Sequence, residues 1–386
     1  GKQRPAIHDK EKLSQLAKTM FETVKEDGWH SIFYRWGTSN FISSYAARGL
    51  VSVRNYQSSI FPQHADFAGP NVRTRFEIKP EPCWGCRMHH CNHMNVTDGP
   101  YSGYEAEEPE LVGWLHWGAN IGVTDPGTVV MLTDVSDRLG LDIMETAMIV
   151  SWVMECYQKE LISSQDLGGL QLTWGNAEAV RSLLHMIALR QGYGAVLADG
   201  LKRAAESKGE AARDCAVYTL RGNNTTAKDQ RVTWNGLLDL CLSNTGTYEA
   251  GHLWARPDQL GIEPVKDPFS PEQVSTNLAQ IKGNFQFYDS LGVCVFTTAA
   301  DIRLVVDMLN AATGWDFTVD EAMDVGRRAV NLMRVFNLRH GLTADQERPS
   351  ARLGAAPNDG PVKGISIMPH WDTMRRNYYR HMGWDA

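Results

Sequence analysis

Apolar residues recur at helical spacing through most of the chain. Between residues 9 and 28 the apolar residues lie three and four positions apart with charged residues between them, and the pattern ends at Gly28. The same spacing, bounded by Asp, Asn, Ser, Thr or Gly, predicts further helices over 125–140, 142–160, 176–192, 194–209, 270–285, 298–314 and 318–341. No strand-rich segment or internal repeat stands out. The pattern therefore predicts a mainly α-helical protein.

Two segments interrupt this pattern. Residues 45–82 are rich in Pro, Gly and aromatic residues and lead into a run of Cys and His, which we expect to lie on a loop. Residues 221–261 are rich in turn formers and carry an isolated His252. A polar segment at residues 206–214 indicates a boundary between two domains. We therefore predict two helical domains, 1–212 and 213–386.

Composition narrows the class of protein. The 386 residues suffice for two or three domains, and the net charge of −7 without a basic block argues against nucleic acid as a partner. No apolar run is long enough to span a bilayer, and residues 1–15 lack the apolar core of a secretory signal, so we expect a cytoplasmic protein. Seven cysteines, four of them scattered singly, indicate a reducing compartment and a metal or cluster site rather than a disulfide framework.

The candidate chemistry begins with the run PEPCWGCRMHHCNH at residues 80–93. Two residues separate Cys83 from Cys86, so a turn between them lets both thiolates bind one metal, and Cys91 follows after four more. Three interpretations fit these residues: an iron–sulfur cluster with a distant fourth ligand, a zinc site, or a Cys/His loop without metal. Zinc sites usually have a second ligand pair about 12–20 residues away, whereas the histidines here lie within the same run.

Two hexamers elsewhere in the chain resemble each other. They are DRLGLD at residues 137–142 and DSLGVC at residues 289–294. Each is compatible with an ordinary helix end in which glycine adopts the left-handed conformation. The alternative is that the two loops hold two similar halves of one ligand, and that Cys294 supplies the fourth cluster ligand.

With these motifs the chain resembles the tungsten-containing aldehyde:ferredoxin oxidoreductases. Segments such as WGNAEA, GYGAVLADGLKRAAE and SNTGTYEAGHL extend the likeness over nearly the whole sequence. The resemblance implies a tungsten (or molybdenum) bis-pyranopterin cofactor, with one D-x-x-G motif for each pterin, a [4Fe–4S] cluster, and allows for a magnesium ion between the pterin phosphates. The residues it implies are Asp137, Gly140, Asp142, Asp289 and Gly292 for the pterins and Cys83, Cys86, Cys91 and Cys294 for the cluster.

The chain departs from the family pattern in two ways. The family opens with a β-rich domain that this sequence lacks, so we expect the second and third domains only, with the first supplied by another polypeptide or lying outside the sequence. The family spacing C-x2-C-x3-C would place the third ligand at His90. Either the loop has gained a residue and Cys91 is the ligand, which we favour because thiolate ligation is commoner, or His90 replaces it.

The resemblance also implies catalytic residues. The family's carboxylate matches the segment AEEPELVGW, where Glu110 is the first candidate and Glu108 the second, against the alternative of a solvated acidic loop. The family's catalytic histidine matches His252. The alternative is that this isolated histidine has a structural role. Trp254 stands where the family pattern has a lysine, which removes one contact to a pterin.

The implied function is oxidation of aldehydes to carboxylic acids, with electrons passing through the cluster to ferredoxin. The alternative within the superfamily is the tungsten subunit of a class II benzoyl-CoA reductase, which reduces an aromatic acyl-CoA with the help of further iron–sulfur subunits. In that branch Cys91 would face tungsten instead of the cluster. A remote alternative is a zinc-binding structural protein.

Overall fold

A computed structural model describes residues 6–28, 30–226, 228–245, 249 and 256–385. The first half of the chain forms α1 (Lys10–Glu26), α2 (His30–Trp36), α3 (Ile42–Ala47), α4 (Gly69–Arg75), α5 (Leu111–His116), α6 (Pro126–Arg138), α7 (Ile143–Gln158), α8 (Ala177–Ala188), α9 (Gly194–Leu197), α10 (Leu201–Ser207) and α11 (Glu210–Cys215). The second half forms α12 (Trp234–Leu242), α14 (Pro271–Ile281), α15 (Asn284–Leu291), α16 (Val295–Thr298), α17 (Ile302–Thr313), α18 (Val319–Arg339), α19 (Ala351–Gly354) and α20 (Trp371–Met382).

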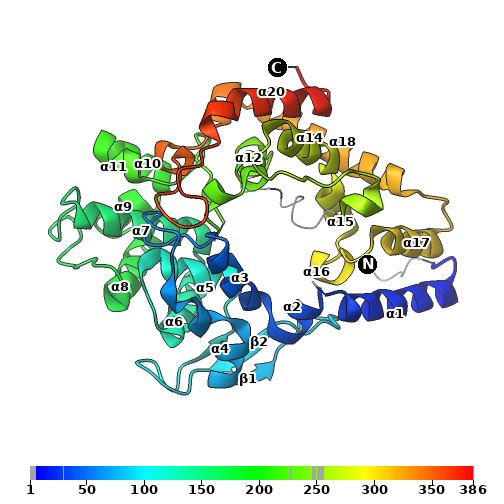
Figure 1. Ribbon diagram of the computed structural model, residues 1–386. Coiled ribbons are helices and arrows are strands. Elements are labelled where there is room, and N and C mark those ends of the chain that lie inside the picture. Colours follow the sequence, from blue (N-terminus) through cyan, green and yellow to red (C-terminus); the bar gives the residue numbers. More distant parts are fainter. Residues whose placement is uncertain (1–5, 29, 227, 246–248, 250–255, 386) are drawn as a thin grey trace.

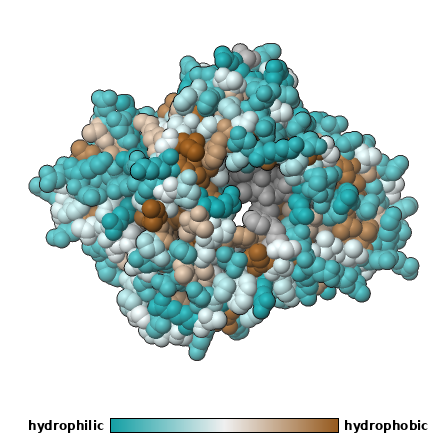
Figure 2. All heavy atoms as spheres, in the orientation of Figure 1, coloured by the Kyte–Doolittle hydropathy of each residue, from teal (hydrophilic) through white to brown (hydrophobic). Residues whose placement is uncertain are grey.

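Short 3-10 turns connect these helices. They are η1 (Thr38–Phe41), η2 (Pro62–Phe67), η3 (Ala119–Ile121), η4 (Gln230–Val232), η5 (Pro257–Leu260), η6 (Ala344–Gln346) and η7 (Met368–His370). Figure 1 shows α5 to α11 on the left of the molecule and α14 to α18 on the right, where α1 of the first half also lies. The face seen there is hollowed between them (Figure 2). The predicted mainly α-helical class is confirmed.

Polar caps begin the predicted helices where the sequence places them. The side chain of Asp9 accepts a hydrogen bond from the backbone of α1, and Thr318 forms a capping box with Glu321 at the start of α18. The helix expected over 194–209 is divided, because Gly200 adopts φ +95° between α9 and α10. The turn-rich segment 221–261 also contains a helix, α12, whose apolar residues are buried.

One small sheet interrupts the helices. Strands β1 (Glu77–Pro80), β2 (Asn92–Asn95) and β3 (Glu105–Glu107) pair antiparallel in the order β1-β2-β3, with Lys79 opposite His93 and His93 opposite Glu107. The strands are too short for an alternating pattern to stand out in the sequence. Strands β1 and β2 flank the Cys/His run, so the sheet sets the two ends of that loop beside each other.

The core of the first half lies around α7. Every residue from 146 to 156 is buried, because α5, α6, α8, α10 and α11 surround this helix. An apolar helix without a polar face is expected at such a central position. Trp114 and Trp117 on and after α5 are fully buried beside it. The residues that follow β3 are therefore anchored to a rigid core.

The two halves are joined at more than one place. Helix α1 packs against α16 and α17, and the guanidinium of Arg87 in the Cys/His run lies 4.5 Å from the ring centre of Phe21 on α1. Near the other end, α19 packs against α11. The predicted domain boundary at residue 212 stays a prediction. Helices near both ends of the chain pack across this boundary. Among the described residues, no helix has both the length and the apolar character needed to cross a membrane.

Helices α15 and α18 cross at two glycines. A methyl group on Gly326 would overlap the carbonyl oxygen of Gly283, the residue that precedes α15. We expect Gly326→Ala to lower the free energy of unfolding by about 3 kcal/mol, because backbone atoms cannot move aside as a flexible side chain can. Urea denaturation would measure it. Gly28→Ala, where no atom lies within 4 Å of the added methyl, is the control and should change the stability by less than about 1 kcal/mol. Equal stability of the two variants would contradict the close crossing.

His116 predicts an acid sensitivity. Burial lowers its pKa from 6.5 to about 4, and neither ring nitrogen has a hydrogen-bond partner among the described residues. Between these values the unfolded chain binds a proton that the folded chain does not, so stability falls as the pH drops below 6.5. We expect the free energy of unfolding to fall by about 2 kcal/mol from pH 7 to pH 5 through this group. Denaturation at both pH values should show a smaller fall in His116→Gln. The same fall in both proteins would refute the assignment.

Candidate functional site

The Cys/His run forms a closed loop between β1 and β2. The backbone N–H of Glu81 donates to the carbonyl of Cys91 at 3.1 Å and closes the loop. Within it the N–H of Cys86 donates to the carbonyl of Cys83 at 3.0 Å, and Gly85 takes the left-handed conformation this turn requires, with φ +72°. The turn predicted between the first two cysteines is therefore present.

Cys294 approaches this loop from the other half of the chain. It follows α15 and precedes α16, and its thiol interacts electrostatically with those of Cys86 and Cys83. The thiol of Cys83 in turn interacts electrostatically with that of Cys91. All four cysteines are free thiols. The fold thus places Cys294, about 200 residues further along the chain, near enough to the thiols of this loop to interact with them electrostatically.

The surroundings of these thiols suit a bound cation. Burial raises the pKa of Cys91 to about 12, with Glu110 and Cys83 acting in the same direction. Burial likewise raises the pKa of Cys294. Such thiols stay protonated alone, and a metal that coordinates them replaces the protons. Four convergent cysteines in this setting fit the donor set of an iron–sulfur cluster.

His90 lies between Cys91 and Glu110. Its Nε2 lies 2.9 Å from Oε1 of Glu110, and its ring meets that of Phe296 edge-on at 5.1 Å. The same Nε2 is 3.6 Å from Sγ of Cys91. Ligand atoms of His90, Cys91 and Glu110 all lie within 4.8 Å of one another. The contacts among cysteines favour Cys91 over His90 as a metal-ligand candidate, while His90 joins the Cys/His loop to Glu110.

Glu110 is held by residues that the sequence could not associate with it. It precedes α5, and Oγ1 of Thr38 donates to its Oε2 at 2.5 Å while accepting from the N–H of Leu111 at 2.8 Å. Burial would raise the pKa of Glu110, but hydrogen bonds with His90 and Thr38 keep it below its usual value. Its side chain nevertheless remains 48% accessible. Glu110 is thus an ionised carboxylate, oriented and still reachable.

Glu108 has different surroundings. Its side chain is 5% accessible, and both oxygens accept hydrogen bonds from the guanidinium of Arg73, at 2.9 and 2.7 Å. The amide of Asn92 donates to Oε2 at 2.7 Å. A buried carboxylate with these partners is saturated. Its contacts favour a structural role for Glu108 and leave Glu110 as the stronger catalytic candidate.

The two D-x-x-G segments share one geometry. The N–H of Gly140 donates to the carbonyl of Asp137 at 3.0 Å, and that of Gly292 to Asp289 at 3.0 Å, each with a left-handed glycine at a helix end. A methyl group on either glycine would meet no atom within 4 Å. Both segments are helix caps with open space beside them, which a ligand can occupy.

The acidic residues of these segments differ in their contacts. Asp142 caps α7 by accepting from the N–H of Glu145 at 2.7 Å. Asp137 lies near Glu107, which brings the first segment close to the Cys/His loop, and burial raises the pKa of Asp137 and of Asp289. His252 and Trp254 lie outside the described residues.

Comparisons with known proteins show the family of this chain. A family model described as "Aldehyde ferredoxin oxidoreductase, domains 2 & 3" matches residues 15–386. The tungsten-containing aldehyde ferredoxin oxidoreductase of Pyrococcus furiosus is 30% identical over 396 residues, which cover 100% of this chain and 63% of that protein. The aliphatic sulfonate oxidoreductase WOR-like subunit of the same organism is 27% identical, over 99% of this chain and 60% of its own length.

A solved structure has the same fold. It is described as the active site complex BamBC of benzoyl coenzyme A reductase with 1,5-dienoyl-CoA. Its TM-score is 0.75 at 15% identity, over 100% of this chain and 64% of the other. This chain spans less than two thirds of the length of these proteins. It belongs to the aldehyde ferredoxin oxidoreductase family and corresponds to the second and third domains of that family.

Proposed function

We propose that this chain forms the cofactor-holding domains of a tungsten pterin oxidoreductase that converts aldehydes to carboxylic acids and passes electrons through a [4Fe–4S] cluster to ferredoxin. The observation that carries the proposal is the convergence of Cys83, Cys86, Cys91 and Cys294. A structural zinc site would not explain the two D-x-x-G segments. Both segments leave open space beside their glycines, as loops that hold a larger cofactor would.

Each group has candidate residues in the chain. The four cysteines would hold the cluster, while Asp137, Asp142 and Asp289 would accept hydrogen bonds from the pterins. When bound, the tungsten pterin supplies the two-electron oxidation that no amino-acid side chain provides. In the overall reaction an aldehyde and water yield a carboxylic acid, two protons and two electrons. The protein must orient the substrate and move the protons.

Glu110 is suited to the proton transfer. It is ionised and accessible, and Thr38 and His90 restrict its carboxylate to one orientation. A carboxylate in this state can accept a proton from water or from substrate at Oε1 or Oε2. We keep His252 as the second proton-transfer candidate on the family resemblance.

A ring reductase related to benzoyl-CoA reductase is the second candidate. The compact group of His90, Cys91 and Glu110 favours it, since their ligand atoms could approach one metal without the other cysteines. In that case Cys91 would face tungsten, and partner iron–sulfur subunits would deliver electrons. The sequence relatives are named as aldehyde and sulfonate oxidoreductases, so aldehyde chemistry is our first choice.

Anaerobic purification with the co-purifying subunits tests the proposal. We expect about four irons per chain, together with tungsten or molybdenum, and aldehyde-dependent reduction of ferredoxin. Reduction of an aromatic acyl-CoA, without aldehyde oxidation, would favour the second candidate. Zinc without iron and without tungsten would refute both.

A further inference from the structure

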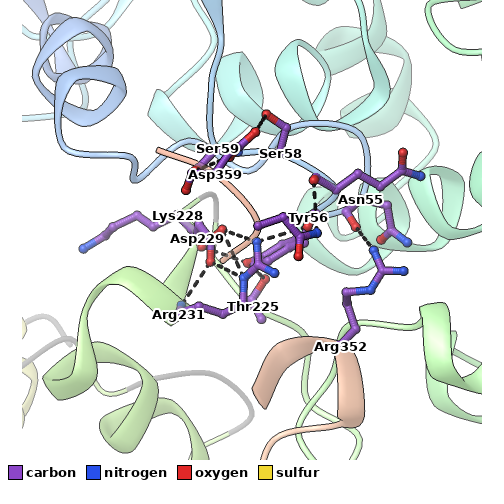
Figure 3. Close-up of polar contacts among 12 residues, drawn as sticks. Asn55, Tyr56, Ser58, Ser59, Thr225, Lys228, Asp229, Arg231, Arg352 and Asp359 are labelled. Carbon is purple, nitrogen blue, oxygen red and sulfur yellow. Dashed lines mark hydrogen bonds and ion pairs between the residues drawn. The ribbon is translucent and has the colours of Figure 1, made fainter. Parts of the chain in front are cut away.

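A second polar pocket lies away from the candidate active site. It has a volume of about 540 Å³ and opens between the end of α7, η4, α19 and the loop after α3. Its lining residues are Gln57, Glu155, Gln158, Lys159, Arg231, Arg352, Ala355 and Asn358. None of them belongs to the cluster loop or the D-x-x-G segments. Figure 3 shows the network of polar side chains around it.

The backbone beside this pocket is strained. Arg54, Asn55 and Tyr56 have φ values of 46°, 54° and 63°, so three consecutive residues other than glycine adopt the left-handed conformation. Each costs on the order of 1 kcal/mol or more. The N–H groups of Arg54 and Asn55 both donate to carbonyls of η3, and the hydroxyl of Tyr56 donates to the carbonyl of Lys228 at 2.8 Å. Strain maintained by so many contacts is commonly found at functional sites.

The carboxylates near the pocket are already saturated. Oε1 of Glu155 lies 2.7 Å from Nζ of Lys159 and accepts from Arg352 at 2.7 Å, while its Oε2 accepts from Asn55 at 2.6 Å. Asp229, buried behind the wall, accepts from Nε and Nη2 of Arg231. Asp359 does not line the pocket and accepts from Ser58 and Ser59 (Figure 3).

Some N–H groups of the pocket's arginine side chains have no hydrogen-bond partner among the described residues. Arg231 also donates through Nη2 to the carbonyl of Tyr56, yet its Nη1 has no hydrogen-bond partner among the described residues. Arg352 uses Nη1 for the carbonyl of Asn55 and Nη2 for Glu155, and no partner for its Nε is found in the described part of the chain. Lys159 is 48% accessible. Three cations thus line the pocket against one lining carboxylate, and two of them keep an N–H group without a hydrogen-bond partner among the described residues.

We propose that this pocket binds a phosphate-type tetrahedral oxyanion. Two guanidinium groups and an ammonium match the charge and acceptor pattern of such an anion, and guanidinium forks are preferred for it. The volume exceeds that of a lone phosphate. The amides of Gln57, Gln158 and Asn358 can bind the rest of a larger molecule, so the phosphoryl end of a nucleotide-type compound fits as well as the free ion.

Titration of the purified holoenzyme tests the proposal. The probes are inorganic phosphate, sulfate and adenosine monophosphate, each followed by calorimetry against chloride at matched ionic strength. We expect saturable binding of at least one probe. Adenosine monophosphate binding at least tenfold tighter than phosphate would identify a nucleotide-type ligand, and equal binding would identify the free anion.

Two variants locate the binding in the pocket. Gln158→Glu adds a negative charge to the wall without breaking an ion pair, and Lys159→Gln removes a cation; each should weaken binding at least tenfold. Gln165→Glu, the same exchange at an exposed position outside the pocket, should bind like the original protein. Absence of saturable binding, or unchanged affinity in both pocket variants, would overturn the proposal.

Discussion

Replacing Cys294 by serine is expected to reduce the iron content of the holoenzyme from about four per chain to below about one. Cys294 is the only one of the four convergent cysteines that comes from the second half of the chain. A serine hydroxyl is a poor ligand for iron, and the three remaining sulfurs all lie in one short loop. Iron analysis and the visible absorbance of the anaerobic protein would measure the loss. Electron transfer to ferredoxin should be lost in parallel.

A matched exchange separates loss of a ligand from loss of a thiol. Cys156 is buried in α7, far along the chain from the loop, and Cys156→Ala should retain the full iron content. If Cys294→Ser kept its iron and its absorbance, the cluster would have another fourth ligand. His90 would then be the first residue to examine, because its Nε2 lies 3.6 Å from Cys91.

Replacing Glu110 by glutamine is expected to lower kcat by about 10²- to 10⁴-fold. The amide keeps the size of the side chain and can still bond with Thr38, but it cannot accept a proton as the carboxylate does. Iron and tungsten contents and the melting temperature should stay close to those of the original protein. Steady-state kinetics with metal analysis would establish this.

Glu108→Gln makes the matching comparison two residues away. It leaves Arg73 as a buried cation without its bidentate partner, so we expect a loss of about 3 kcal/mol in the free energy of unfolding. The folded fraction should retain its kcat. If Glu108→Gln abolished turnover in well-folded protein while Glu110→Gln did not, the roles assigned to the two residues would be reversed.

Local signals predicted much of the fold. Asp9, Asp125, Asn176, Ser270 and Thr318 begin helices where the sequence placed them, because capping depends on residues only three positions apart. Helix α12 was missed, since its environment of turn formers hides a short apolar segment that is helical only when buried. The three strands were missed for the same reason, because their pairing joins segments that share no local pattern.

In the candidate site too, residues with a local sequence signal were predicted, and residues defined only by contacts in the fold were not. Spacing pointed to Cys83, Cys86 and Cys91, and the likeness of two hexamers pointed to Cys294. Glu108 and Glu110 look equivalent in an acidic run, and only burial and the partner Arg73 distinguish them. Thr38 could not be found, because a hydroxyl 72 residues before Glu110 carries no signal in the sequence.

The four cysteines have a consequence for how the protein assembles. A metal group bonded to Cys91 and Cys294 would close a loop of about 200 residues, as a disulfide does. By chain-entropy reasoning, a cross-link of this span is worth about 5 kcal/mol. Cys294 lies between α15 and α16, so binding of such a group by all four cysteines would require both halves to be folded. The bound cluster would then act as a cross-link that stabilises the contact between the two halves.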